Sequence, residues 1–160
     1  MPSVLFVCTG NRYRSPLAAA IFSKCLEKTE DRTEWIVGSA GTWTKSGLPP
    51  DSRAIRDAKH LGLDLKSHHS RQVDASLLAQ SNLVLVMEAG QKEALQIEFP
   101  AEREKIRLLS EVVDGTSYDI LDTFGLGEDA GQDDAQELSG LIVSGFKNIC
   151  EQARNRSSGS

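Results

Sequence analysis

Short apolar runs recur along the chain, and each one ends at a glycine or at a group of polar residues. Residues 3–8 (SVLFVC) and 82–87 (NLVLVM) are the clearest, and residues 34–37 and 106–109 are shorter examples. An apolar run of this length that stops at a turn signal is too short for a buried helix, so it predicts a buried strand. We therefore expect four strands.

Segments with a helical spacing of apolar residues separate these strands. Residues 16–28 combine that spacing with three alanines, and we expect the helix to begin with Ser15 as its N-cap and Pro16 at its first position. Residues 133–154 place their apolar side chains on one stripe, which is typical of a helix that packs against a core. Two further helices are predicted, over residues 51–61 and 89–98.

Strands that alternate with helices predict an α/β fold. We expect three α/β/α layers, with a twisted, four-stranded parallel sheet between the helices. Ligands of such sheets bind beyond the carboxyl ends of the strands, so the loop after residue 8 is the first place to look for a site. The chain has 160 residues and no repeat or linker that divides it, so we expect one domain over residues 1–155 and a flexible tail over residues 156–160.

The charge balance excludes two classes of partner. The chain has 18 Lys and Arg against 23 Asp and Glu, which gives a net charge of −5. Nucleic acid and anionic membranes are bound through positive surfaces, so we expect neither as a partner. No apolar run approaches the ~18 residues of a membrane span, and the start of the chain does not resemble a secretory signal. We therefore expect a cytoplasmic protein.

The cysteines do not form a metal-binding or disulfide pattern. Cys8, Cys25 and Cys150 are an odd number, with no CxxC pair and no paired Cys/His spacing. This arrangement disfavours a disulfide framework and a structural zinc site. We expect free thiols and no metal.

Residues 8–15 (CTGNRYRS), the phosphate loop, have the spacing Cys, five residues, Arg, Ser between a strand and a helix. Consecutive backbone N–H groups in such a loop, with the free amides of the helix N-terminus, form a concave donor cluster for a tetrahedral dianion. Gly10 permits tight backbone angles, and Arg14 could hold two oxygens of the anion. The positive surroundings favour a thiolate at Cys8. The alternative is a buried cysteine beside a loop that binds sulfate or a nucleotide phosphate incidentally.

Residues 4–11, followed by Arg14-Ser15-Pro16, resemble the low-molecular-weight protein tyrosine phosphatase family, which includes bacterial arginine phosphatases and fold-sharing arsenate reductases. The resemblance implies that family's fold and a two-step hydrolysis without metal or cofactor. It extends in the family's order through residues 38–42, Pro50-Asp51 with Arg53-Ala54, His68 with residues 70–72, residues 82–87 and residues 122–125.

The resemblance also assigns catalytic roles. Cys8 would attack phosphorus to form a cysteinyl-phosphate, and Arg14 would bind the equatorial oxygens of the transition state. Asp122 would protonate the leaving oxygen and later activate water, because Asp122-Thr123-Phe124 is the best match to the family's Asp-Pro-aromatic segment. The alternative is that Asp114, Asp119 and Asp122 are solvated loop charges. The expected phosphate-binding residues are Thr9, Gly10, Asn11, Arg12, Tyr13, Arg14 and Ser15.

Supporting residues carry over from the family in the same way. His68, rather than His69, aligns with the family pattern His-x-Ala-Arg-Gln. Aromatic walls of the cleft would favour a flat aryl phosphate, although the same rings could be ordinary packing. The expected hydrogen-bonding network of the loop is Asn11, Ser15, Ser39 and His68, and the expected cleft walls are Trp43, Phe124, Arg12 and Tyr13.

Two loop residues depart from the family. Tyr13 stands where many members carry a second cysteine that can form a protective disulfide with the nucleophile, so we expect Cys8 to lack that rescue from overoxidation. Arg12 stands where tyrosine phosphatases usually carry an apolar residue and arginine phosphatases a threonine. A second arginine would repel a guanidinium phosphate and favour acidic neighbours of a phosphotyrosine, or it points into solvent. Residues 26–149 contain no cysteine, which disfavours thioredoxin-linked arsenate reduction.

These features predict a phosphatase that acts on phosphotyrosine in proteins and releases inorganic phosphate, as a monomer or a weak dimer. Two alternatives stay open. One is a protein arginine phosphatase, and the other is a phosphate-binding regulatory module with weak turnover.

Overall fold

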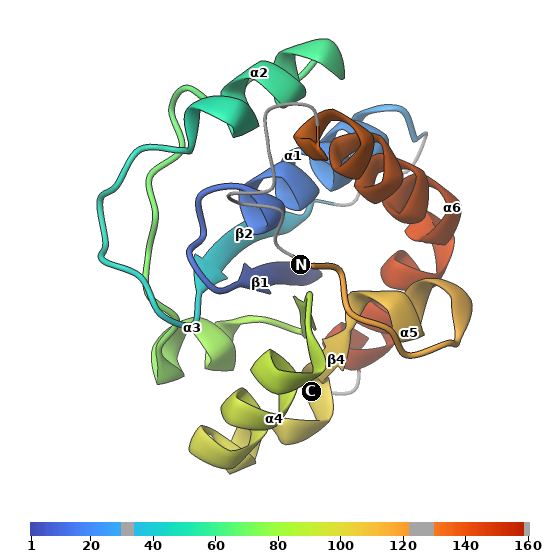
Figure 1. Ribbon diagram of the computed structural model, residues 1–160. Helices are drawn as coiled ribbons and strands as arrows, with labels where there is room; N and C mark the ends of the chain where they lie inside the picture. Colours follow the sequence, from blue (N-terminus) through green and yellow to red (C-terminus); the bar gives the residue numbers. More distant parts are fainter. Residues whose placement is uncertain (30–33, 122–129, 159–160) are drawn as a thin grey trace.

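The computed structural model describes residues 1–29, 34–121 and 130–158, and these form the three layers of an α/β fold (Figure 1). Within these ranges, four parallel strands form one sheet in the order β2-β1-β3-β4. The predicted fold class is confirmed. The strands are β1 (Ser3–Cys8), β2 (Ile36–Gly41), β3 (Leu83–Val86) and β4 (Ile106–Leu108).

Helices cover both faces of the sheet (Figure 1). One face packs against α1, α2, α5 and α6, and the other packs against α3 and α4. No helix of the described ranges is long and apolar enough to cross a membrane. The helices are α1 (Arg14–Glu27), α2 (Ser52–His60), α3 (Ala75–Gln80), α4 (Ala89–Glu98), α5 (Leu109–Asp114), α6 (Ala130–Ser158) and the 3₁₀ helix η1 (Pro100–Lys105).

Strand β1 is the centre of the core, and all six of its residues are buried. Alternate residues of a strand point to opposite faces of a sheet. Phe6 and Cys8 therefore belong to the cluster beneath α1 and α6, whereas Leu5 and Val7 belong to the cluster beneath α3 and α4. This alternation places the Cys8 side chain on the α1 face, at the carboxyl end of the strand.

The apolar stripe of α6 packs as the pattern predicts. Leu138, Ile142 and Ile149 are buried, and the ring of Phe146 lies 5.3 Å from that of Phe22 in α1. Gly145 permits close contact with α5, because a Cβ atom there would lie 2.5 Å from a methyl carbon of Val113. This packing holds α6 beside α1, the helix that follows the phosphate loop.

Several elements differ from the prediction at their ends. β2 extends through residues 38–41, which were expected to form a turn, because Ala40 pairs with Val7 and Gly41 pairs with Cys8. Helix α6 continues to Ser158, into the segment expected to be a tail. The elements α3, α5 and η1 were not predicted, because six residues are too few to show a helical period.

Candidate active site

The phosphate loop joins the end of β1 to the start of α1, and its shape depends on Asn11. Asn11 is fully buried and has φ of 57°, in the left-handed region that asparagine tolerates better than most residues. Its side chain accepts a hydrogen bond from the Arg71 N–H at 3.0 Å and donates one to the Ser15 hydroxyl at 2.8 Å. Its carbonyl oxygen lies 2.7 Å from Nε2 of His68. These contacts fix the loop from two sides.

His68 supports the loop as a hydrogen-bond donor. Burial lowers the pKa of His68, and its hydrogen bond to Asn11 partly opposes this effect. A neutral ring that carries its proton on Nε2 satisfies the Asn11 carbonyl. His69 is exposed and lies against the Ser67 carbonyl instead, so the structure brings His68 to the loop and leaves His69 outside.

The Cys8 sulfur is buried beneath the loop and has two polar neighbours. The Ser15 hydroxyl lies 3.0 Å from it, and the Asn11 N–H donates to it at 3.3 Å. The Ser15 oxygen accepts a hydrogen bond from Asn11, and its own proton can go to the Cys8 sulfur or to the Ala40 carbonyl, which lies 3.4 Å away. The Asn11 N–H and the Ser15 hydroxyl therefore both lie within hydrogen-bond distance of this sulfur.

Backbone N–H groups of the loop are available to an anion. The amides of Gly10 and Arg12 have no acceptor among the described residues. Arg14 and Ser15 begin α1, and amides in the first turn of a helix have no acceptor within the helix. The helix dipole adds positive potential at the same place. The loop thus has the donors that a tetrahedral oxyanion requires.

Arg14 is held beside the loop by two acceptors. Only 5% of its surface is exposed, and its Nη1 donates to Glu88 at 2.7 Å and to the Ile120 carbonyl at 2.7 Å. Gln91 donates both to the Glu88 carboxylate at 3.1 Å and to the Thr9 hydroxyl at 2.9 Å, which ties this group back to the loop. Guanidinium bonds of this kind fix the plane of the side chain.

Glu88 and Gln91 were not singled out in the sequence. Both follow β3, the strand next to β1 in the sheet. The carboxyl ends of parallel strands lie along one edge, which was the available signal for Glu88.

The side chains that were expected to form the cleft walls differ in their exposure and in their hydrogen-bond partners. Trp43 is 84% exposed, and its backbone N–H donates to the Thr9 carbonyl at 3.1 Å, so its main chain lies beside the loop. The Arg12 side chain donates to the Pro49 carbonyl at 2.8 Å, at the surface. The Tyr13 hydroxyl donates to Asp57 in α2.

Ser39 lies in β2, where it pairs with Phe6 of β1. The Ser39 carbonyl accepts a hydrogen bond from Nε of Arg71 at 2.9 Å. The residue that joins β2 to the loop is Gly41, since a Cβ atom there would lie 2.6 Å from the Thr9 carbonyl. The close approach of two main chains at this point requires glycine.

Asp122 and Phe124 lie outside the described residues. The segment that leads to them is fixed near Arg14, because the Ile120 N–H donates to the Met87 carbonyl at 2.8 Å. Two other loop aspartates accept local hydrogen bonds: Asp119 accepts from the Ala89 N–H at 2.8 Å, and Asp114 accepts from the Tyr118 hydroxyl at 2.9 Å.

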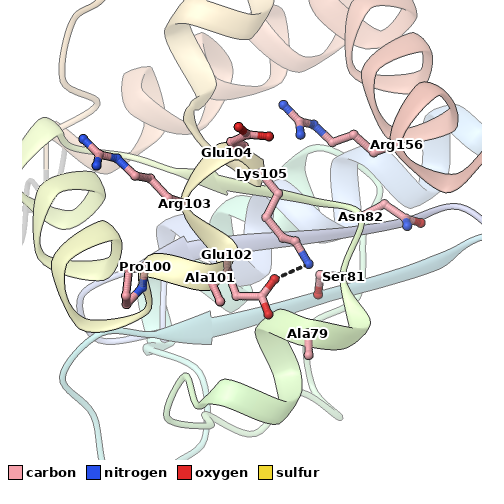
Figure 2. Close-up of a pocket in the computed structure, with 10 residues that line it drawn as sticks. All are labelled: Ala79, Ser81, Asn82, Pro100, Ala101, Glu102, Arg103, Glu104, Lys105 and Arg156. Atoms are coloured by element: carbon pink, nitrogen blue, oxygen red, sulfur yellow. Dashed lines mark ion pairs between the residues drawn. The ribbon is translucent and has the colours of Figure 1, made fainter. Parts of the chain in front are cut away.

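A cavity of about 560 Å³ lies away from the phosphate loop. Figure 2 shows that Arg103, Lys105 and Arg156 line it together with acidic residues, and that Lys105 pairs with Glu102. Asn82, which also lines it, precedes β3, so the cavity lies at the amino edge of the sheet. A smaller cavity of about 360 Å³ is lined by Tyr13, Arg14 and apolar side chains of α6. In the described ranges, no three His, Cys, Asp or Glu side chains could hold a metal ion.

Comparison with known proteins identifies the family. The model of the low molecular weight phosphotyrosine protein phosphatase family matches residues 3–157. A probable low molecular weight protein-tyrosine-phosphatase, EpsP, from Ralstonia nicotianae is 34% identical over 122 residues, which are 76% of this chain and 78% of the relative. A protein-arginine-phosphatase from Bacillus subtilis is 32% identical over 141 residues, which are 87% of this chain and 91% of the relative.

The fold of a solved structure agrees with this result. A YwlE arginine phosphatase mutant with a phosphorylated active-site serine superposes with a TM-score of 0.87 at 29% identity, over 95% of this chain and 98% of that chain. The chain belongs to the low molecular weight phosphotyrosine protein phosphatase family, as its motif predicts. It is an enzyme of the hydrolase class, and its relatives include both tyrosine and arginine phosphatases.

Proposed function

We propose that this chain hydrolyses phosphotyrosine in proteins through a cysteinyl-phosphate intermediate and releases inorganic phosphate. The observation that carries the proposal is the position of the Cys8 sulfur, beneath free loop amides and within hydrogen-bond reach of Ser15 and Asn11. A thiolate at this position lies next to the phosphorus of any phosphate that those amides hold.

The proposed first step transfers the phosphoryl group to sulfur. The Cys8 thiolate forms a bond to phosphorus while the bond from phosphorus to the tyrosine oxygen breaks, and Asp122 gives its proton to that oxygen. The loop amides and Arg14 stabilise the charge on the three equatorial oxygens. The phosphorylated active-site serine of the related YwlE mutant supports a covalent intermediate of this kind.

The proposed second step returns the enzyme to its starting state. The Asp122 carboxylate takes a proton from water, the water oxygen attacks phosphorus, and the bond from sulfur to phosphorus breaks. Phosphate leaves and Cys8 is again a thiolate. Asp122 has this role by its resemblance to the family motif.

Two features at the mouth of the loop support an aryl phosphate as the substrate. The Trp43 main chain is bonded to the Thr9 carbonyl, and its ring is exposed, which leaves a flat apolar surface free for a phenyl group. The positive Arg12 side chain donates a hydrogen bond to the Pro49 carbonyl at the surface. Its charge disfavours a cationic guanidinium phosphate and favours acidic residues next to the phosphotyrosine.

The second candidate is a protein arginine phosphatase, and the relative from Bacillus subtilis with that name favours it. Competition between a phosphotyrosine peptide and a phosphoarginine peptide of the same sequence tests the choice. We expect a higher kcat/KM for phosphotyrosine. A higher kcat/KM for phosphoarginine would reverse the assignment.

Hydrolysis of p-nitrophenyl phosphate tests the catalytic roles. We expect no turnover with Cys8→Ser, and a fall in kcat of ~10²-fold or more with Asp122→Ala, while both variants still bind vanadate. Asp114→Ala is the matched control, because Asp114 bonds to Tyr118 and not to the loop. Tight vanadate binding by a wild-type chain without turnover would instead favour the regulatory module. The cytoplasmic location and the monomer or weak dimer stay predictions.

A further inference from the structure

Tyr13 connects the phosphate loop to helix α2. Its hydroxyl donates a hydrogen bond to Oδ2 of Asp57, 44 residues later in the chain. The guanidinium carbon of Arg53 lies 5.8 Å from the centre of the Tyr13 ring, within the range of a cation–π contact. Burial and the Asp57 carboxylate raise the pKa of Tyr13, so the hydroxyl keeps its proton over the working pH range.

Asp57 is a buried carboxylate without a role in the proposed reaction. Only 1% of its surface is exposed, and its second oxygen accepts a hydrogen bond from Nε of Arg56 at 3.2 Å. A buried carboxylate is costly to desolvate and persists where specific donors surround it. One of those donors comes from the phosphate loop.

A second contact joins the same part of the loop to the start of α2. The carbonyl of Arg12 accepts a hydrogen bond from the Asp51 N–H at 2.9 Å, and Asp51 is the N-cap of α2. Residues 9 and 11 of the loop are held by other segments, through Gln91, His68 and the Arg71 N–H. Helix α2 therefore anchors the half of the loop that leads into Arg14.

We propose that Tyr13 and Asp57 are a positioning pair, which holds the backbone of residues 12–14 in the shape that binds an oxyanion. The pair acts through the Arg12 and Arg14 amides and does not touch the substrate. This inference rests on the proposed function, since the contact between Tyr13 and Asp57 would support the same phosphate-binding loop. The resemblance offers no counterpart, because many family members have a cysteine at the position of Tyr13.

The test measures oxyanion affinity and turnover in a double-mutant cycle. The variants are Tyr13→Phe, Asp57→Ala and the double variant, with inorganic phosphate in calorimetry and p-nitrophenyl phosphate in kinetics. We expect each single variant to weaken phosphate binding and to lower kcat/KM about fivefold to tenfold. The double variant should be no worse than either single variant, because the pair is already broken.

Two further variants separate positioning from stability. Asp57→Asn keeps an oxygen that accepts from Tyr13, so its phosphate affinity should stay within about twofold of wild type. Tyr118→Phe removes a tyrosine–aspartate bond of the same kind that is not attached to the loop, and it should leave phosphate affinity unchanged. Urea unfolding of each variant measures its free energy of unfolding, so that a loss of phosphate affinity can be separated from a loss of stability.

Three results would overturn the pair. The first is a Tyr13→Phe variant that binds phosphate as tightly as wild type. The second is a double variant whose loss of phosphate affinity is the sum of the two single losses. The third is an Asp57→Asn variant that binds phosphate as weakly as Asp57→Ala. The phosphate-binding measurement does not depend on turnover. A wild-type chain that binds phosphate but hydrolyses nothing would therefore contradict the proposed function and still test the pair.

Discussion

The Ser15 hydroxyl lies 3.0 Å from the Cys8 sulfur and 2.8 Å from the amide nitrogen of the Asn11 side chain. Since the amide nitrogen of asparagine can only donate, the serine oxygen accepts from it, and the serine proton can go to the sulfur at 3.0 Å or to the Ala40 carbonyl at 3.4 Å. A hydrogen bond to a charged group contributes more than one between neutral groups.

Ser15→Ala should lower kcat with p-nitrophenyl phosphate by about 10- to 100-fold, because the thiolate loses a charge-assisted donor. Alkylation of Cys8 by iodoacetate should slow in parallel. Ser144→Ala is the matched control, since the Ser144 hydroxyl donates to the Leu141 carbonyl on the surface of α6, away from the loop. Unchanged kcat in Ser15→Ala would show that the serine does not support the nucleophile.

Asn11→Ala should reduce the free energy of unfolding by about 2–4 kcal/mol, because it loses two buried side-chain hydrogen bonds and places alanine in a left-handed conformation. Asn11→Gly should recover about 1 kcal/mol of this loss, since glycine adopts that conformation without strain. Urea unfolding measures both values. Equal stability of the alanine and glycine variants would contradict the strain argument.

Stability should depend on pH through His68. Its pKa in the folded chain is lowered from 6.5 by burial, so the unfolded chain binds more protons as the pH falls below 6.5. The His68 contribution to stability is therefore complete above pH 6.5 and is lost as the pH falls through the folded pKa. Unfolding in urea at about pH 7.5 and about pH 5.5 measures the difference. It should shrink in His68→Asn and persist in His69→Asn.

Peroxide should oxidise Cys8 beyond the reversible stage. Tyr13 stands at the position where many members of the family have a second cysteine, and its hydroxyl donates a hydrogen bond to Asp57. Cys25 and Cys150 lie in α1 and α6, outside the loop. Mass spectrometry should find sulfinic or sulfonic acid at Cys8. A reversible disulfide between Cys8 and either of the other cysteines would refute this expectation.

The sequence was sufficient for the parts of the fold that local patterns encode. The apolar run of residues 3–8, followed by the Cys-to-Arg spacing of the loop, predicted both a buried strand and the loop at its carboxyl end. The stripe of α6 predicted a packed helix. The short helices α3 and α5 could not be predicted, because their contacts with the sheet, and not their own periodicity, stabilise them.

Tertiary contacts decided the rest of the site. Glu88 and Asp57 reach the loop from helices far away in sequence, and an isolated acidic residue gives no signal of such a partner. Ser39 was expected in the hydrogen-bonding network of the loop, and its carbonyl accepts a hydrogen bond from Nε of Arg71. Residue type alone does not distinguish a side-chain donor from a main-chain acceptor.

One nitrogen of Arg14 is shared between Glu88 and the Ile120 carbonyl, and residue 120 lies just before the segment that contains Asp122. An anion that accepts a hydrogen bond from this nitrogen weakens its hydrogen bonds to Glu88 and to the Ile120 carbonyl. Thermodynamic linkage then makes the exchange mutual: whatever displaces the Ile120 carbonyl changes the affinity for the anion by the same factor. Anion binding by the phosphate loop and the hydrogen bond between Arg14 and the Ile120 carbonyl are in this way linked.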